Sequence, residues 1–214
     1  MELYIVRHGQ TVWNAEGRLQ GSEDIELNEN GRELAGKLGE SLEGVKFDRI
    51  YSSPLIRAYE TACLIRGHRN IPIIRDERIR EISFGVMEGH DYREFFSEGS
   101  PYFTFFSAPE KYGPPREAES FEDVIKRTGE FFRQVIMKEC TGLERVMVVA
   151  HGTSNKAFMY NLEGQTDISK YWGPGLQKNG EADIYILGKE GWKRKPGTSA
   201  AIDERWGKRP PKKA

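Results

Sequence analysis

Residues 3–14 read LYIVRHGQTVWN, and residues 146–152 read VMVVAHG. Each stretch is an apolar run, which is typical of a strand covered on both faces of a parallel sheet, and each run leads to a histidine followed by glycine. Glycine at this point allows the chain to turn sharply and a ligand to approach the backbone. Ligands of open α/β sheets bind beyond the carboxyl ends of the strands. The two stretches therefore predict a ligand site at that edge, with His8 and His151 in it.

Strands and helices alternate along the rest of the chain. Hydrophobic spacing predicts helices over residues 29–43, 55–65, 121–140 and 153–162, the third one capped by Ser120 with Asp123. Apolar runs predict further strands over 47–53, at the start of 71–82, over 144–150 and, at an edge, over 182–187. Residues 14–31 are rich in Gly, Asn, Asp and Glu, and predict a loop. This order predicts a three-layer α/β/α fold with a mostly parallel central sheet.

One catalytic domain over residues 1–187 accounts for this pattern. Within it, residues 91–119 are predicted to form an irregular lid, because residues 99–116 hold four prolines and five aromatic residues. Those aromatic residues either form an apolar wall for a ligand or pack the lid onto the core. Residues 188–214 hold nine Lys or Arg against three acidic residues, and predict an extended basic tail.

Composition narrows the class of protein. The 214 residues are 37% hydrophobic and 30% charged, with a formal net charge of −1, so nothing indicates a nucleic acid or a membrane as partner. No apolar run is long enough to span a bilayer, and the first residues do not resemble a secretory signal. The two cysteines have no metal-site spacing. We therefore expect a reduced, cytoplasmic protein; a homodimer through the edge strand or the aromatic lid is left open.

Two arginines indicate the ligand. Arg7 directly precedes His8, and Arg57 falls in the first turns of a helix that follows a strand. A guanidinium fork matches phosphate or carboxylate oxygens, and a helix start adds free N–H groups and a positive dipole end. Two arginines, two histidines and a helix start at one place favour a phosphoryl group. The same arginines disfavour a metal ion, so we expect neither a metal nor a cofactor.

Four motifs in order, RHG, SSPLIRAYETA, REISFGVMEG and AHG, carry a resemblance over residues 1–165. They resemble the histidine phosphatase superfamily, in the branch that also contains the cofactor-dependent phosphoglycerate mutases. The resemblance implies a phosphoglycerate mutase-like fold in which His8 attacks phosphorus and becomes a phosphohistidine. It also implies that Arg7, Arg57 and His151 hold the phosphoryl oxygens and that Glu81 transfers the proton.

The remaining site residues are expected around this centre. Asn14 and Gln20 match residues that line the phosphate pocket, and the neighbouring Gly21 and Gly152 are expected to bind substrate with them. Arg116 in the lid is expected to reach a second anionic group of the substrate, with a solvated lid charge as the alternative. For Glu81 the alternative is a surface carboxylate paired with Arg78 or Arg80.

The stretches RIREISFGVMEG and LQGSED are more similar to the phosphatase members than to the mutases. We therefore predict a phosphomonoester hydrolase that acts on a small phosphorylated metabolite. Phosphoglycerate mutase-type transfer and a catalytically weak, phosphate-binding regulatory protein are the alternatives. Gln10 stands where many relatives have glutamate, and Lys156 is predicted to face solvent.

Overall fold

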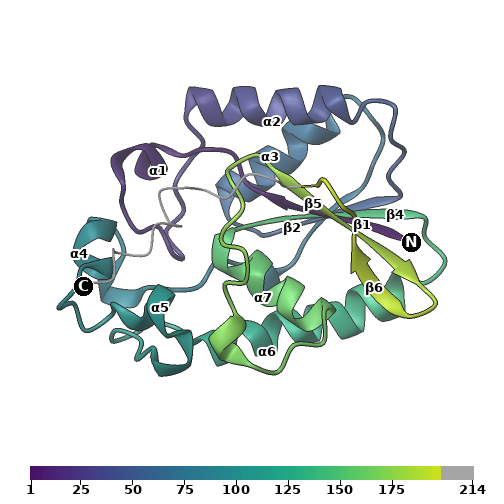
Figure 1. The fold of residues 1–214 in the computed structure, drawn as a ribbon. Coiled ribbons are helices and arrows are strands. Elements are labelled where there is room, and N and C mark those ends of the chain that lie inside the picture. Colours follow the sequence, from purple (N-terminus) through teal and green to yellow (C-terminus); the bar gives the residue numbers. More distant parts are fainter. Residues whose placement is uncertain (199–214) are drawn as a thin grey trace.

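A computed structural model describes residues 1–198, and its centre is a six-stranded sheet in the order β3-β2-β4-β1-β5-β6. The strands are β1 (Glu2–Arg7), β2 (Arg49–Ser52), β3 (Ile73–Arg75), β4 (Arg145–Ala150), β5 (Ala182–Gly188) and β6 (Gly191–Arg194). β1, β2, β3 and β4 pair in parallel, whereas β5 is antiparallel to both of its neighbours. Helices cover both faces (Figure 1), so the predicted three-layer α/β/α class is confirmed.

The helical layers are the following. One face carries α2 (Glu29–Ser41) and α3 (Ile56–Arg66), and the other carries α6 (Phe121–Phe131), its π-helical continuation η4 (Phe132–Glu139) and α7 (Gly152–Leu162) (Figure 1). Short helices complete the chain: α1 (Val12–Glu16), η1 (Glu77–Ile79), η2 (Gly85–Met87), α4 (Tyr92–Phe96), α5 (Thr104–Ser107), η3 (Pro109–Lys111) and η5 (Ile168–Lys170). None of the helices within residues 1–198 is long and apolar enough to cross a membrane.

The central strands are buried on both faces because both of their side-chain rows are apolar. In β1, Leu3 and Ile5 pack with the α6–α7 layer, whereas Tyr4 and Val6 pack with the α2–α3 layer. β4 pairs with β1 in register, Leu3 opposite Val146. Burying both rows stabilises the sheet by about 1.5–3 kcal/mol for each large side chain. The same register brings Arg7 opposite Ala150, so the two strands end together.

The lid is more regular than predicted. Residues 92–111 form α4, α5 and η3, and Phe95, Phe105 and Tyr112 are buried between them. Their rings meet at centroid distances of 5.0–6.5 Å, within the range for favourable aromatic pairs. Aromatic packing therefore orders a segment whose prolines prevent long helices.

Other expectations were wrong in detail. The predicted loop 14–31 overlaps helix α1, which begins with a capping box formed by Thr11 and Asn14. The helix ends at Gly17, whose φ of 74° lies in the left-handed region. β5 is not an edge strand, because residues 191–194 of the predicted extended tail form β6 and cover it. The rest of that tail, residues 199–214, lies outside the described residues. The Ser120–Asp123 capping box of the predicted helix 121–140 is confirmed.

Candidate active site

The paired ends of β1 and β4 bring His8 and His151 together, as the sequence predicts. The His8 amide donates to the carbonyl oxygen of Ala150 at 3.0 Å, which extends the sheet by one residue. The two imidazole centroids then lie 5.1 Å apart. Both side chains are buried, so their ionisation is governed by their neighbours rather than by solvent.

His8 is arranged as a neutral nucleophile. Its Nδ1 lies 2.7 Å from the carbonyl oxygen of Gly9, and since a carbonyl can only accept, Nδ1 carries the proton. The lone pair is therefore on Nε2. Burial lowers the pKa of His8 well below its usual range, and the charges of Arg57 and Arg7 lower it further. The predicted hydrogen bond that fixes the tautomer is thus present.

Arg57 is fully buried at the start of α3 and has its guanidinium held by the protein. Its Nη2 donates to the Gly21 carbonyl at 2.7 Å, and its Nη1 donates to the Glu23 carbonyl at 2.6 Å. Its Nε donates to His151 Nδ1 at 3.2 Å. Burial lowers the pKa of Arg57 to about 10, which leaves it protonated at neutral pH. A rigid, desolvated cation of this kind stabilises charge without reorganising.

His151 has both ring nitrogens in use within the protein. Nδ1 accepts from Arg57, so the neutral ring carries its proton on Nε2, which lies 2.8 Å from Ser53 Oγ and donates to it. Burial and the charge of Arg57 lower the pKa of His151 well below its usual range. His151 thereby holds Arg57 in place as well as lying next to His8.

The guanidinium group of Arg7 is held by a residue that is distant in the sequence. Its Nη1 donates to the carbonyl oxygen of Gln177, and the side chain passes close to Gly152. A Cβ at Gly152 would lie 3.6 Å from the Arg7 guanidinium and 3.2 Å from Leu176. Glycine therefore leaves room for Arg7 at the start of α7.

Glu81 lies at the start of α7 and not in a surface ion pair. Its Oε1 accepts from the amides of Ile82 (3.0 Å) and Ser154 (2.9 Å), and its Oε2 accepts from the amide of Thr153 (3.2 Å). The alternative partners are engaged elsewhere, Arg78 with Asp76 and Arg80 with Glu77. The first amides of α7 thereby hold the carboxyl group of Glu81 in a fixed position.

A cavity of about 60 Å³ connects these groups. Its lining includes eight of the ten predicted site residues, namely Arg7, His8, Asn14, Gln20, Gly21, Arg57, Glu81 and Gly152. His151 does not line it but contacts Arg57, which does. Thr11 orders the loop side of the cavity, since its hydroxyl lies 2.9 Å from Gln20 Oε1 and 3.2 Å from Asn14 Oδ1. Arg116 is not brought there: its side chain is 80% exposed and pairs with Glu117 at 3.3 Å.

Several residues that hold the site residues in place are not predicted from the sequence. Thr61 Oγ1 accepts from the Gly9 amide at 3.0 Å, and Asn179 donates to the His8 carbonyl at 3.0 Å. Ser53 belongs to the SSPLIRAYETA motif, which offers a signal for it, whereas Gln177 and Asn179 lie in a loop that carries no motif. Gln10 accepts through Oε1 from Asn28 (2.9 Å) and Asn30 (3.1 Å), bonds that a glutamate would also accept.

Away from the polar groups, the cavity wall is apolar. It is formed by Leu19, Phe84, Phe96, Phe105, Phe106 and Leu176, with Trp13-stacked Arg18 at the edge. Of the two expectations for the lid aromatics, both hold for different residues. Tyr112 packs the lid without lining the cavity, whereas Phe105 and Phe106 line it.

Comparisons with known proteins identify the family of the chain. Residues 3–195 match the model of the histidine phosphatase superfamily (branch 1). The chain is 33% identical over 186 residues to phosphoserine phosphatase 1 of Hydrogenobacter thermophilus, covering 87% of each chain. It is 31% identical over 164 residues to 2,3-bisphosphoglycerate-dependent phosphoglycerate mutase 2 of Gloeobacter violaceus, covering 75% of each chain.

Among solved structures, Bacillus stearothermophilus YhfR superposes with a TM-score of 0.83 at 35% identity, covering 94% of this chain and 97% of that one. A family model spanning most of the chain and relatives above 30% identity leave one assignment. The chain belongs to the histidine phosphatase superfamily.

Proposed function

We propose that this protein hydrolyses a small phosphomonoester through a phosphohistidine formed on His8. The observation that carries the proposal is the buried His8 with its proton fixed on Nδ1 by Gly9, which leaves the Nε2 lone pair available. A buried, neutral imidazole flanked by two guanidinium groups suits attack on phosphorus, because the cations stabilise the charge of the transferring group.

The reaction would proceed in two displacements. In the first, Nε2 of His8 forms a bond to phosphorus while the ester P–O bond breaks, and Glu81 gives its proton to the leaving oxygen. In the second, a water oxygen attacks phosphorus, its proton passes to Glu81, and the N–P bond breaks to release phosphate. Arg7 and Arg57 would bind the phosphoryl oxygens in both steps. The anchoring of Arg57 by Gly21, Glu23 and His151 supports this role.

The apolar wall supports a substrate whose leaving group is apolar. Phosphoserine would present a carboxylate and an ammonium group to the same wall, where aromatic rings offer neither a charge nor a strong acceptor. We therefore expect kcat/KM to be higher for 1-naphthyl phosphate than for phosphoserine. Phe106→Ala should reduce this ratio, whereas Phe103→Ala, in the same segment but outside the cavity lining, should leave it unchanged. If both variants changed the ratio equally, the apolar wall would not determine the preference between the two substrates.

The test of the function itself uses His8→Ala with His90→Ala as the matched control, since His90 is half exposed on the lid side. Wild type and His90→Ala should release phosphate from p-nitrophenyl phosphate, and His8→Ala should lose about 10³-fold or more of kcat. Rapid quenching with ³²P-labelled substrate should trap an acid-labile, base-stable phosphoenzyme in the wild type and in His90→Ala but not in His8→Ala.

Two outcomes would favour the alternatives. Isomerisation of 3-phosphoglycerate in the presence of 2,3-bisphosphoglycerate that is faster than phosphate release would make the protein a mutase. Phosphate binding without turnover of any phosphomonoester in a broad panel would make it a regulatory binder.

A further inference from the structure

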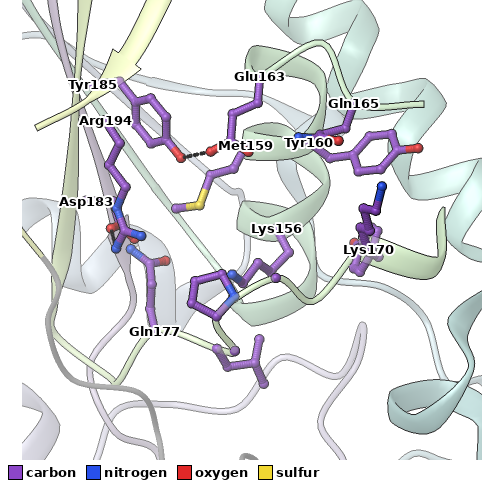
Figure 2. Close-up of a pocket in the computed structure, with 15 residues that line it drawn as sticks. Lys156, Met159, Tyr160, Glu163, Gln165, Lys170, Gln177, Asp183, Tyr185 and Arg194 are labelled. Carbon is purple, nitrogen blue, oxygen red and sulfur yellow. Dashed lines mark hydrogen bonds and ion pairs between the residues drawn. The ribbon is translucent and has the colours of Figure 1, made fainter. Parts of the chain in front are cut away.

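A second cavity of about 420 Å³ lies between α7, the sheet edge and residues 163–177 (Figure 2). α7 contributes Lys156, Met159 and Tyr160, β5 contributes Asp183 and Tyr185, and β6 contributes Arg194. The volume falls in the range of small-molecule sites. The proposed phosphatase reaction uses none of these side chains.

Lys156 is the unusual residue of this cavity. It was predicted to face solvent, but α7 is buried along almost its whole length and only 8% of Lys156 is exposed. Within residues 1–198, Nζ has no hydrogen-bond partner and no carboxylate oxygen within 4.0 Å. An ammonium group on a largely buried side chain with no partner among the described residues is unfavourable, and burial lowers the pKa of Lys156 to about 8.

The other polar groups around Lys156 are already engaged. Arg194 forms an ion pair with the buried Asp183, whose negative charge also acts on Lys156. The Tyr185 hydroxyl donates to Glu163 at 2.6 Å. In Figure 2 Lys156 lies centrally, between the Asp183–Arg194 side and the Tyr160–Lys170 side.

The side chain of Gln177 is likewise committed. It donates through Nε2 to the Ile5 carbonyl at 2.9 Å and accepts through Oε1 from Asn155 at 2.9 Å. Lys170 is 71% exposed and pairs with Asp167 at 3.2 Å. The cation that a ligand could neutralise is therefore Lys156.

The walls define the rest of the ligand. Met159, Tyr160, Tyr171 and Leu176 supply apolar and aromatic surface. The lining holds three cationic side chains, Lys156, Lys170 and Arg194, against two anionic ones, Glu163 and Asp183, an excess of one positive charge. A ligand with one negative charge and a flat or apolar body is complementary to such a cavity.

We propose that this cavity is a second small-molecule site, which binds a compound with one carboxylate by pairing that carboxylate with Lys156. The site is separate from the catalytic cavity and does not depend on the phosphatase proposal, because binding rather than turnover defines it. The two cavities share Leu176, and the carbonyl of Gln177 holds Arg7, so the second site adjoins the catalytic one.

The experiment compares aromatic monocarboxylates with their neutral amides, benzoate with benzamide and nicotinate with nicotinamide. Each is titrated into the full chain at pH 7, with calorimetry and the thermal unfolding midpoint as readouts. The expected result is that at least one carboxylate binds the wild type at least 10-fold more tightly than its amide. Lys156→Met should abolish the difference, whereas Lys178→Met, at an exposed position outside the lining, should keep it. Binding should also weaken from pH 7 to pH 9 in the wild type, as Lys156 loses its proton.

Two results would overturn the proposal. One is that neither carboxylate is preferred over its amide at concentrations up to about 10 mM, a weak limit for a specific site. The other is a preference that survives in Lys156→Met, because the carboxylate would then be bound by the catalytic arginines. A circular dichroism spectrum and unfolding curve of Lys156→Met establish that the variant is folded, so loss of binding has one meaning.

Discussion

The cavity at His8 and the second cavity both have Leu176 in their lining, but they differ in how the protein provides partners for their charged side chains. Arg57 donates to three acceptors of the protein, and Glu81 accepts from three backbone amides. Lys156 has no such partner within residues 1–198. The Arg57 cation has its hydrogen bonds within the protein, so it can stabilise a reacting group without reorganisation. The Lys156 ammonium has none in the described part of the chain, so it lowers the stability of the fold until a ligand neutralises it.

The largest effect is expected from Glu81→Gln, which tests the catalytic cavity. For an alkyl phosphate, kcat should fall about 10²–10⁴-fold, because the leaving alkoxide needs a proton. With p-nitrophenyl phosphate the first step needs little acid assistance, so stopped-flow should still record a burst of nitrophenolate before slow turnover. Glu77→Gln, an exposed neighbour, is the control. Equal loss of burst and turnover would mean that Glu81 acts through position and not through its proton.

Arg57→Lys is expected to reduce kcat/KM by about 10²–10³-fold, because an ammonium cannot reproduce the fork that joins Gly21, Glu23 and His151. Arg66→Lys, at the other end of α3, should have little effect. Steady-state kinetics with p-nitrophenyl phosphate measure both variants. Near-normal activity of Arg57→Lys would show that the protein's own contacts to this cation are dispensable.

Lys156→Met tests the second cavity through stability. The folded pKa of Lys156 is about 8 and its ordinary value is 10.5, so the unfolded chain holds this proton more tightly. The wild type should therefore gain stability as the pH rises from 8 to 10.5, by at most about 3 kcal/mol. Urea unfolding at pH 7 and pH 10 should show this gain in the wild type and in Lys170→Met. If the gain in stability between pH 7 and pH 10 persisted in Lys156→Met, it would arise from another titrating group.

The buried histidines His8 and His151 are expected to give a smaller effect on stability at acidic pH. The folded pKa of His8 and of His151 lies well below 6.5, so the unfolded chain takes up their protons first when the pH falls. Stability is unaffected by them above pH 6.5 and is lost below it, by about 1.4 kcal/mol per pH unit for each histidine. Unfolding in urea at pH 6.5 and 5.5 should show a shallower loss in His8→Ala than in His90→Ala. Equal slopes would mean that His8 is not held neutral by the fold.

Much of the site could be predicted because its residues follow local patterns. An apolar run followed by Arg-His-Gly places Arg7 and His8 at a strand end, and the parallel register then brings His151 to the same edge. Arg116 shows the limit of this reasoning. A cation in a proline-rich lid carries no periodicity that fixes its direction, and the fold turns Arg116 to solvent beside Glu117.

Residue patterns along the chain are sufficient to predict the alternation of strands and helices and the two strand ends that carry His8 and His151, because these depend on neighbours in the sequence. Tertiary structure alone decided what surrounds them. Arg57 and His151 are 94 residues apart, and Arg7 and Gln177 are 170 apart. Helix periodicity placed Lys156 on α7, but β5, β6 and residues 163–177 buried it. Contacts over such separations depend on the path of the whole chain, which no local pattern contains.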